Sequence, residues 1–411
     1  LMLSSVNDQA VGAVGTANTY IGIFIIMFSV ISSGMVAVMT QNIGAGRPGV
    51  AYQARQLGLA FNAVLGIILS LILAFGAGTI LAGVGVADAL MQPARTYLQI
   101  VGGFCILNAL IPICSSYLRA FGFSKEPLYA SIIGNVINFC MNAFFLFVLH
   151  KGVAGVATAT VISRIINLVI VVLLGAVLVK AKKHPERESN RAVMGQIIRI
   201  GLPSACETAI YNVSMTLVIR FLNQMDAQGL NVTARSYTMQ ITNFSYCVGA
   251  ALAQANAIMT GWHIGAKEYD ACDRGTKKAA VIGVIVAVIL ETVFTLCSGW
   301  IMQLFSKDPQ MVSLVGKLLA IDIVLEIGRV TNLVYGQALK TSGDAVFPVV
   351  MGACFMILCS VGGTYLFGIR LGLLAVGAYI GMAGDECVRA VGMYLRWKSG
   401  KWKEKGLVKS R

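Results

Sequence analysis

Long apolar segments alternate with short polar connections along the chain. Many of these segments exceed the roughly 20 residues that an α-helix needs to cross the hydrocarbon core of a bilayer. A segment such as 281–290 is apolar without interruption, whereas a strand of a membrane β-barrel alternates apolar and polar residues. The pattern therefore predicts an all-α polytopic membrane protein.

The same pattern predicts eleven transmembrane helices and implies a twelfth before the chain begins. Residues 1–11 hold too few apolar positions for a span, so we expect that most of the first helix is missing. Pro127 suits a first helical turn, where the absent N–H of proline costs nothing. The predicted spans are 11–41, 52–81, 90–118, 127–149, 153–179, 192–225, 231–262, 271–305, 311–339, 345–367 and 373–397.

Residues in two polar connections recur 221 positions later in the chain. The matched pairs are Ile43 and Ile264, Gly44 and Gly265, Ala45 and Ala266, Leu118 and Leu339, Arg119 and Lys340, Gly122 and Gly343, and Pro127 and Pro348. One shared offset is better explained by internal duplication than by chance. Because an even number of spans precedes the second copy, we expect two pseudo-symmetric six-helix lobes that face the same way. A cleft between two such lobes, opened to each side in turn, is transporter architecture.

The segment KAKKHPERESNR, residues 180–191, separates the two predicted copies. Its charged side chains cannot lie in hydrocarbon, so it predicts a linker in water between two membrane-embedded lobes. We therefore divide the chain into an N-terminal lobe (1–179), a linker (180–191), a C-terminal lobe (192–398) and a basic tail (399–411).

The formal net charge is +14, with 57% hydrophobic and 12% charged residues. Most Lys and Arg lie in alternate connections and in the tail, whereas the opposite connections hold Arg95, Lys151, Lys307 and Arg370. This asymmetry follows the positive-inside rule and predicts that the linker and the C-terminus of a cell-membrane protein are cytoplasmic. The charge thus reports topology, and nucleic acid is not an expected partner.

Charged groups inside a membrane cost several kcal/mol or more, so they usually serve a function. Glu207 lies one turn after Pro203, with Tyr211 on the same helix face and Asn212 beside it. A proline inside a membrane helix frees a backbone carbonyl near this carboxylate. The arrangement predicts a site for a coupling ion or a cationic substrate. The alternative is a protonated, hydrogen-bonded structural Glu207.

Asp322, Glu326 and Arg329 lie at positions i, i+4 and i+7 and therefore share one stripe of a helix. This stripe is a second candidate for ion coupling or substrate binding. The alternative is that Glu326 and Arg329 form a structural ion pair, with Lys317 compensating Asp322. Glu291 has no evident partner in the sequence and stays unassigned.

Five residues are secondary candidates. Asp385, Glu386 and Arg389 lie midway along the last predicted helix, where a structural ion pair is favoured over a binding site. Asn138 and Asn142 share a face of a helix in the first half and suit either a cleft lining or interhelical hydrogen bonds.

Several kinds of chemistry are not expected. The chain lacks the GxxxxGK[ST], HExxH and GxSxG motifs, so it shows no sign of an ATP site, a zinc-protease site or a serine nucleophile. The ten Cys form no CxxC pair and the three His are far apart. We therefore expect no cofactor and no metal other than a transported Na⁺.

Four connections in this chain resemble those of the multidrug and toxic compound extrusion (MATE) family. They are GAGRPGVAYQAR and GAKEYDACDR after the second and eighth helices, and RAFGFSKEP and KTSGDAVFP after the fourth and tenth. GLP at the start of the seventh helix and EIGRVTNLV also fit this resemblance. It implies cation-coupled export of organic, often cationic, compounds by a monomer, with Na⁺ or H⁺ as the coupling ion. It also implies a Glu on the seventh helix and an Asp on the tenth, for which Glu207 and Asp322 or Glu326 are the nearest residues.

Two other readings stay open. A flippase or exporter of a lipid-linked or anionic compound would share the architecture, and Arg164, Arg329 and Arg389 are the basic residues that favour it. A membrane enzyme or receptor would need a dense polar constellation facing its substrate. The sequence contains none, so a transporter is preferred.

Overall fold

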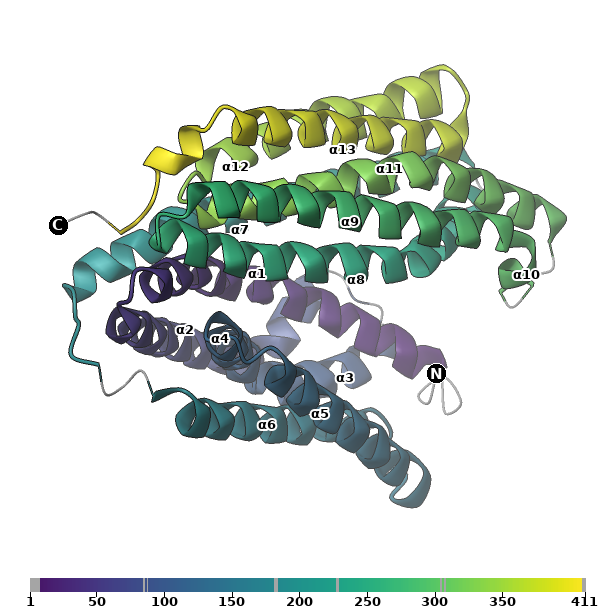
Figure 1. The fold of residues 1–411 in the computed structure, drawn as a ribbon. Helices are drawn as coiled ribbons and strands as arrows, with labels where there is room; N and C mark the ends of the chain where they lie inside the picture. Colours follow the sequence, from purple (N-terminus) through teal and green to yellow (C-terminus); the bar gives the residue numbers. More distant parts are fainter. Residues whose placement is uncertain are drawn as a thin grey trace. The chain divides into compact units, whose positions relative to one another are not determined.

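The computed structural model describes residues 8–83, 86, 88–180, 184–226, 229–303, 305–306 and 308–408. Within these ranges every regular element is a helix (Figure 1), so the predicted all-α fold is confirmed. The expected remnant of a first helix falls largely on residues 1–7, which lie outside the described residues. Residues 181–183 of the linker and 409–411 of the tail also lie outside them.

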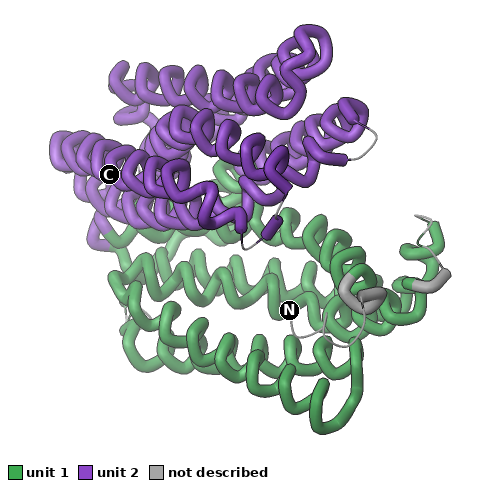
Figure 2. Tube along the Cα trace, turned by 90° about the vertical axis from the view of Figure 1, so that its right-hand side faces the viewer, with its two compact units in different colours: residues 1–43, 47–202 green, residues 44–46, 203–411 purple. Residues whose placement is uncertain are grey.

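The chain divides into two compact units, coloured separately in Figure 2. Unit 1 comprises Leu1–Ile43 and Arg47–Leu202. Leucine and alanine side chains from α1, α2, η1 and α6 form much of its apolar core. Its elements are α1 (Asp8–Gly44), α2 (Pro48–Gly83), α3 (Asp88–Tyr97), the π-helical η1 (Leu98–Gly102), α4 (Ile106–Ala120), α5 (Lys125–Ala143), the π-helical η2 (Phe144–Val148), α6 (Gly152–Leu178) and the first part of α7 (Asn190–Met225).

Unit 2 comprises Gly44–Gly46 and Pro203–Arg411. Its central element is α11, which packs against α8, α9 and α13. Besides the rest of α7, it contains α8 (Leu230–Gly265), α9 (Tyr269–Leu296), α10 (Ser298–Met302), α11 (Pro309–Thr341), α12 (Val346–Phe355), the π-helical η4 (Met356–Val361) and η5 (Thr364–Arg370), α13 (Leu374–Lys398) and the 3₁₀-helical η6 (Lys401–Glu404).

Each of the eleven predicted spans coincides with a helical segment. Among the described residues, six helices are both long and apolar enough to cross a membrane. A seventh span results if the pair Leu90–Gly102 and Ile106–Ala120, bent by 43°, counts as one. Helices α7, α8, α11 and α13 are long enough, at 36, 36, 33 and 25 residues, but are not among the six. Polar and charged residues interrupt their apolar positions, and these helices surround the site described below.

The backbone repeats its conformation at the predicted offset. Gly122 and Gly343 both have positive φ, +89° and +99°. In each connection the glycine N–H donates to the last basic residue of the preceding helix: Gly122 to Arg119 and Gly343 to Lys340. A left-handed residue after a helix is a common way to end it and favours glycine. The matching turns support internal duplication.

The boundary between the units falls inside α7, between Leu202 and Pro203, rather than in the predicted linker. The first part of α7 crosses α1 at two glycines. A Cβ on Gly34 would lie 1.9 Å from the carbonyl oxygen of Ile197, and a Cβ on Gly201 would lie 1.7 Å from that of Val30. Only glycine permits this approach, so residues 190–202 pack with unit 1.

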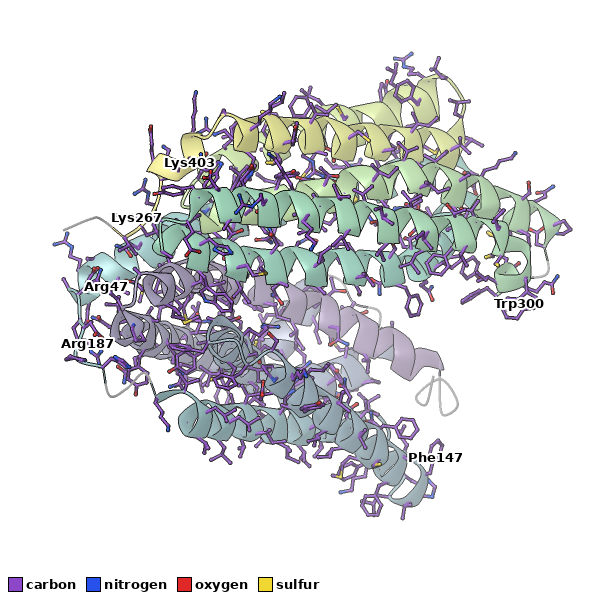
Figure 3. The ribbon with its side chains drawn as sticks, viewed as in Figure 1. Arg47, Phe147, Arg187, Lys267, Trp300 and Lys403 are labelled. Carbon is purple, nitrogen blue, oxygen red and sulfur yellow. The ribbon has the colours of Figure 1, made fainter. Side chains whose placement is uncertain are left out.

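Basic residues mark one end of each unit. In unit 2, Lys267 and Lys403 lie at one end and Trp300 at the other (Figure 3). The predicted tail folds back at the basic end, where the Trp402 ring stacks on Trp397 at 4.1 Å and its Nε1 donates to the Trp397 carbonyl oxygen at 2.9 Å. Buried Trp402 thus anchors a segment that composition alone described only as basic.

Candidate functional site

The predicted stripe on α11 is buried inside unit 2. Asp322 is 2% exposed and Glu326 is fully buried. Arg329 forms an ion pair with Glu326 one turn earlier on the same helix. Gly328 lets α13 approach closely, because a Cβ there would lie 2.7 Å from the Cys387 nitrogen. Their burial lowers the local dielectric and makes the pairing of these charges important.

The predicted trio on α13 is also buried and fully paired. Arg389 donates to Asp385 through Nε and Nη2 at 2.9 and 3.0 Å, and its Nη2 lies 2.8 Å from Glu386 Oε1. The Ser360 hydroxyl donates to Asp385 Oδ2 at 2.9 Å. This bidentate geometry is the strong form of a guanidinium–carboxylate interaction.

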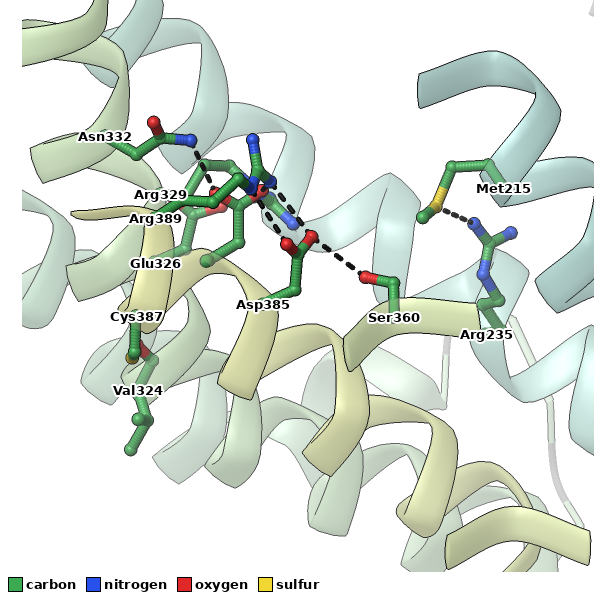
Figure 4. A network of polar contacts seen from close by, with 11 residues as sticks. Met215, Arg235, Val324, Glu326, Arg329, Asn332, Ser360, Asp385, Cys387 and Arg389 are labelled. Carbon is green, nitrogen blue, oxygen red and sulfur yellow. Dashed lines mark hydrogen bonds and ion pairs between the residues drawn. The ribbon is translucent and has the colours of Figure 1, made fainter. Parts of the chain in front are cut away.

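The two groups form one network, drawn in Figure 4. Arg329 Nε lies 3.7 Å from Glu386 Oε1, and Asn332 Nδ2 donates to Glu386 Oε2 at 3.0 Å. Glu386 therefore receives contacts from α11 as well as from Arg389 on its own helix. A change in the charge of the α11 residues therefore alters the electrostatic environment of Glu386 on α13 directly.

A third helix adds a carboxylate that the sequence left unassigned. One oxygen from each of Glu291 on α9, Asp322 and Glu326 lies within 4.8 Å of the others. Both oxygens of Glu291, Asp322 Oδ2 and Glu326 Oε2 are buried and have no hydrogen-bond partner among the described residues. We call these three residues the carboxylate triad.

The triad is electrostatically unbalanced. Together with Asp385 and Glu386 it brings five carboxyl groups around two guanidinium groups, Arg329 and Arg389. Ionised carboxylates this close, buried and lacking partners, are strongly unfavourable. The arrangement can be relieved by protons or by a small cation held between carboxylate oxygens, which are the ligands that hard cations prefer.

Glu207 lies apart from the triad and has its own partner. Its Oε2 is 2.6 Å from Lys340 Nζ, near the end of α11, and both side chains are 15% exposed. Tyr211 lines a small cavity with Arg329, Asp385 and other residues. Both Tyr211 and Asn212 are exposed on α7. The structure therefore brings Tyr211 to the α11–α13 network, and Glu207 pairs with α11 through Lys340 and interacts electrostatically with Arg389 on α13.

The small cavity has a volume of about 10 Å³ and accommodates at most one water molecule. It lies between α7, α11, η4 and α13. Its lining residues are Tyr211, Met215, Arg329, Ser360, Met382, Asp385 and Glu386.

The amides of unit 1 hold neighbouring helices together. Asn142 Nδ2 donates to Asn138 Oδ1 at 3.0 Å, and Asn138 Nδ2 donates to Ser163 Oγ at 3.3 Å. Ser163 lies on α6, so the chain of bonds joins α5 to α6. This is the interhelical alternative that the sequence left open for Asn138 and Asn142.

Comparison with known proteins identifies the family. The MatE family model matches residues 1–144 and 203–366. The chain belongs to the MatE family. MatE proteins are membrane transporters and not enzymes, and they include multidrug efflux proteins, so the expected family and class are confirmed.

Two relatives and one solved structure illustrate the match. The uncharacterized transporter YisQ of Bacillus subtilis is 33% identical over 99% of this chain and 90% of its own length. A probable multidrug resistance protein NorM of Thermotoga maritima is 21% identical over 97% of this chain and 87% of its own. The structure of the MATE transporter ClbM in complex with Rb⁺ has a TM-score of 0.84 at 17% identity, covering 98% of this chain and 90% of that one.

Proposed function

We propose that this protein exports organic, mainly cationic, compounds in exchange for Na⁺ or H⁺ by alternating access, and that the carboxylate triad carries the coupling ion. The observation behind this proposal is the set of buried, partnerless carboxylate oxygens on Glu291, Asp322 and Glu326. A stable core would not keep such groups unless their charge is compensated in part of a working cycle.

The triad suits reversible ion binding. Uptake of a proton or a Na⁺ neutralises part of the excess negative charge, and its release restores that charge. Glu291 and Asp322 have no salt bridge among the described residues, so they are the carboxylates most free to change their state. Glu326 connects that change to Arg329, and Arg329 connects it to Glu386 on α13.

Ion and substrate then compete through the same charge. The network holds more carboxyl groups than guanidinium groups, so it attracts a nearby cationic substrate most strongly when the triad is empty. A bound coupling ion weakens that attraction, so each ligand lowers the affinity for the other, and the coupling is reciprocal. Exchange follows if each occupied state favours a different opening of the transporter.

The relatives support the ion and the cargo class. The ClbM structure was obtained with Rb⁺, a monovalent cation, and the NorM relative is named as a probable multidrug resistance protein. A lipid-linked phosphate as cargo would need available basic groups. Arg329 and Arg389, which the sequence offered for that role, are held by carboxylates, and this favours a cation.

Topology and assembly follow from similar reasoning. We propose that the ends marked by Lys267 and Lys403 in unit 2 and by Arg47 and Arg187 in unit 1 face the cytoplasm. The whole network lies inside unit 2, so a monomer suffices to bind the coupling ion.

A proteoliposome assay tests this function. Na⁺ and pH gradients are imposed separately, and efflux of a cationic dye such as ethidium is followed for the wild-type protein and for Asp322→Asn. The wild type should respond to at least one gradient, and Asp322→Asn should lose at least tenfold of that response. Glu404→Gln, a change at an exposed acid in η6, is the matched control. Full gradient-driven efflux by Asp322→Asn would refute the assignment.

A further inference from the structure

A groove in unit 2 lies at the end opposite its basic residues. Lys267 follows the end of α8 and Lys403 follows the end of α13, so both helices begin at the other end, the one marked by Trp300 (Figure 3). The groove lies between the starts of α8, α11 and α13 and has a volume of about 510 Å³. This is large enough for a small molecule or part of a lipid.

The polar part of the groove is a stripe of hydrogen-bond donors on α11. Gln310, Ser313 and Lys317 line it and are exposed. Their spacing of three and four residues places them on one face of the helix. Among the described residues, none of the three side chains has a hydrogen-bond or ion-pair partner. Lys317 therefore does not compensate Asp322, and its charge is available to a ligand.

The groove offers no free negative charge. Among its described lining residues there is no carboxylate. Its other polar residue, Asn231, is already engaged, because its Nδ2 donates to Asp226 and its Oδ1 accepts from the Ala375 N–H at 3.1 Å. A cation would be repelled by Lys317 and would meet no opposite charge, so the polar part of the groove suits an anion.

The rest of the lining is apolar. Leu230 contributes from α8, and Leu373, Leu374 and Val376 contribute from the start of α13. Leu373 and Leu374 are 44% and 41% exposed. Leu374 also has φ +53°, which is uncommon for a residue other than glycine. Two neighbouring leucines left exposed beside a donor stripe suit a ligand that is anionic at one end and apolar at the other.

Lys317 lies near the depth of lipid phosphates. Helix α11 has 33 residues and is about 50 Å long, whereas the hydrocarbon core is about 30 Å thick. Centred in a bilayer, the helix extends about 10 Å beyond the hydrocarbon at each end. Lys317 lies about 12 Å along the axis from Pro309, so its flexible side chain reaches the boundary where phosphates lie. Trp300, 71% exposed at the same end, is typical of that boundary.

We propose that this groove binds one phospholipid of the adjacent leaflet. Lys317, Gln310 and Ser313 hold its phosphate, and the first part of an acyl chain lies against Leu373 and Leu374. Lysine binds phosphate as a point charge, and the hydroxyl and amide groups add hydrogen bonds. The lipid would join the starts of three helices and stabilise unit 2. This inference depends neither on the coupling ion nor on the exported compound.

The experiment separates the two parts of the ligand. The protein is purified in detergent at pH 7.5 and titrated with dioleoyl phosphatidylglycerol, with dioleoylglycerol, which lacks the phosphate, or with inorganic phosphate, which lacks the chains. The melting temperature is followed in each titration, and native mass spectrometry counts the lipids that stay bound. Neither readout needs transport.

The wild type should retain one phosphatidylglycerol and show a saturable rise in melting temperature, and neither of the other two ligands should reproduce it. Lys317→Gln should weaken the lipid affinity about tenfold, which corresponds to about 1.4 kcal/mol, and Lys317→Arg should keep most of it. Because Lys317 is exposed, the lipid-free melting temperature should not change in either variant. Ser313→Trp, which fills the groove, should also weaken binding. Lys278→Gln, a change at an exposed lysine on α9, is the matched control.

Four results would overturn the proposal. The first two are the absence of any retained lipid and an unchanged lipid affinity in Lys317→Gln. The third is equal stabilisation by dioleoylglycerol, which would make the groove an apolar surface without phosphate recognition. The fourth is the full effect from inorganic phosphate alone, which would assign Lys317 to a free anion instead of a lipid.

Discussion

Removing the Arg329 guanidinium is the most direct structural perturbation of the network. Arg329→Met keeps a long apolar side chain but leaves Glu326, which is fully buried, without its counter-charge. Breaking one side of a buried ion pair costs about 3–5 kcal/mol. Because the Arg329 side chain is 17% exposed, the lower end, about 3 kcal/mol, applies.

The loss should be measured as a melting temperature of the detergent-solubilised protein. For a unit of 150–250 residues, 1 kcal/mol shifts the melting temperature by roughly 2–4 °C, so about 3 kcal/mol predicts a fall of about 6–12 °C. The double variant Arg329→Met/Glu326→Gln should recover most of this fall. Glu386 remains satisfied in that variant, because Arg389 and Asn332 still contact it at 2.8 and 3.0 Å.

The control is Lys277→Met, which removes an ion pair with Asp273 in which the lysine side chain is 52% exposed. An exposed pair contributes little, and no measurable shift is expected. The reasoning is refuted if Arg329→Met melts within 2 °C of the wild type, or if the double variant is as unstable as the single one.

Three further predictions concern other parts of the chain. Gly201→Ala places a methyl 1.7 Å from the Val30 carbonyl oxygen, so it should destabilise the protein by about 1–3 kcal/mol or more, measured as a lower melting temperature; an unchanged one contradicts the close crossing. Lys340→Gln removes the 2.6 Å partner of Glu207 and should lower the melting temperature. Glu207→Gln should keep ion-driven efflux. Loss of ion coupling in Glu207→Gln would instead place the ion site on α7. Burial by itself raises the pKa of Asp226, but hydrogen bonds donated by its neighbours hold that pKa below its ordinary value. The stability of the wild type relative to Asp226→Asn should therefore be present above about pH 4 and vanish as pH falls through the lowered pKa. A stability difference that widens in acid would contradict this.

The sequence was sufficient for the architecture. Apolar runs longer than a membrane span can only be helices, because lipid offers no partner for backbone N–H and C=O groups. The offset of 221 positions also anticipated local geometry, since Gly122 and Gly343 share a left-handed conformation. The bend near residues 103–105 and the return of Trp402 onto Trp397 depend on tertiary packing and left no pattern to find.

The grouping of the candidate residues was predicted in part. Helical periodicity placed Asp322, Glu326 and Arg329 on one stripe of α11, because residues three and four positions apart are neighbours on any helix. The proximity of Glu291 to this stripe was missed, since Glu291 lies on α9 and no spacing reports a contact between helices. A charged residue alone within a predicted span was the available signal.

The partner of Glu207 was missed for the same reason. Lys340 lies far from Glu207 in sequence, and the pair forms only when α7 packs against α11. The proline one turn before Glu207 favoured that residue in the sequence, whereas the triad carboxylate oxygens without hydrogen-bond partners lie on α9 and α11.

The central claim is that the carboxylate triad binds the coupling ion in competition with a cationic substrate. The most direct measurement is the affinity of the purified protein for a cationic dye, titrated with Na⁺ against choline at constant ionic strength and, separately, with pH. The wild type should lose affinity as Na⁺ or proton concentration rises, and Glu291→Gln/Asp322→Asn should lose most of that dependence. An affinity that neither ion alters, or the same dependence in the double variant, would contradict the account.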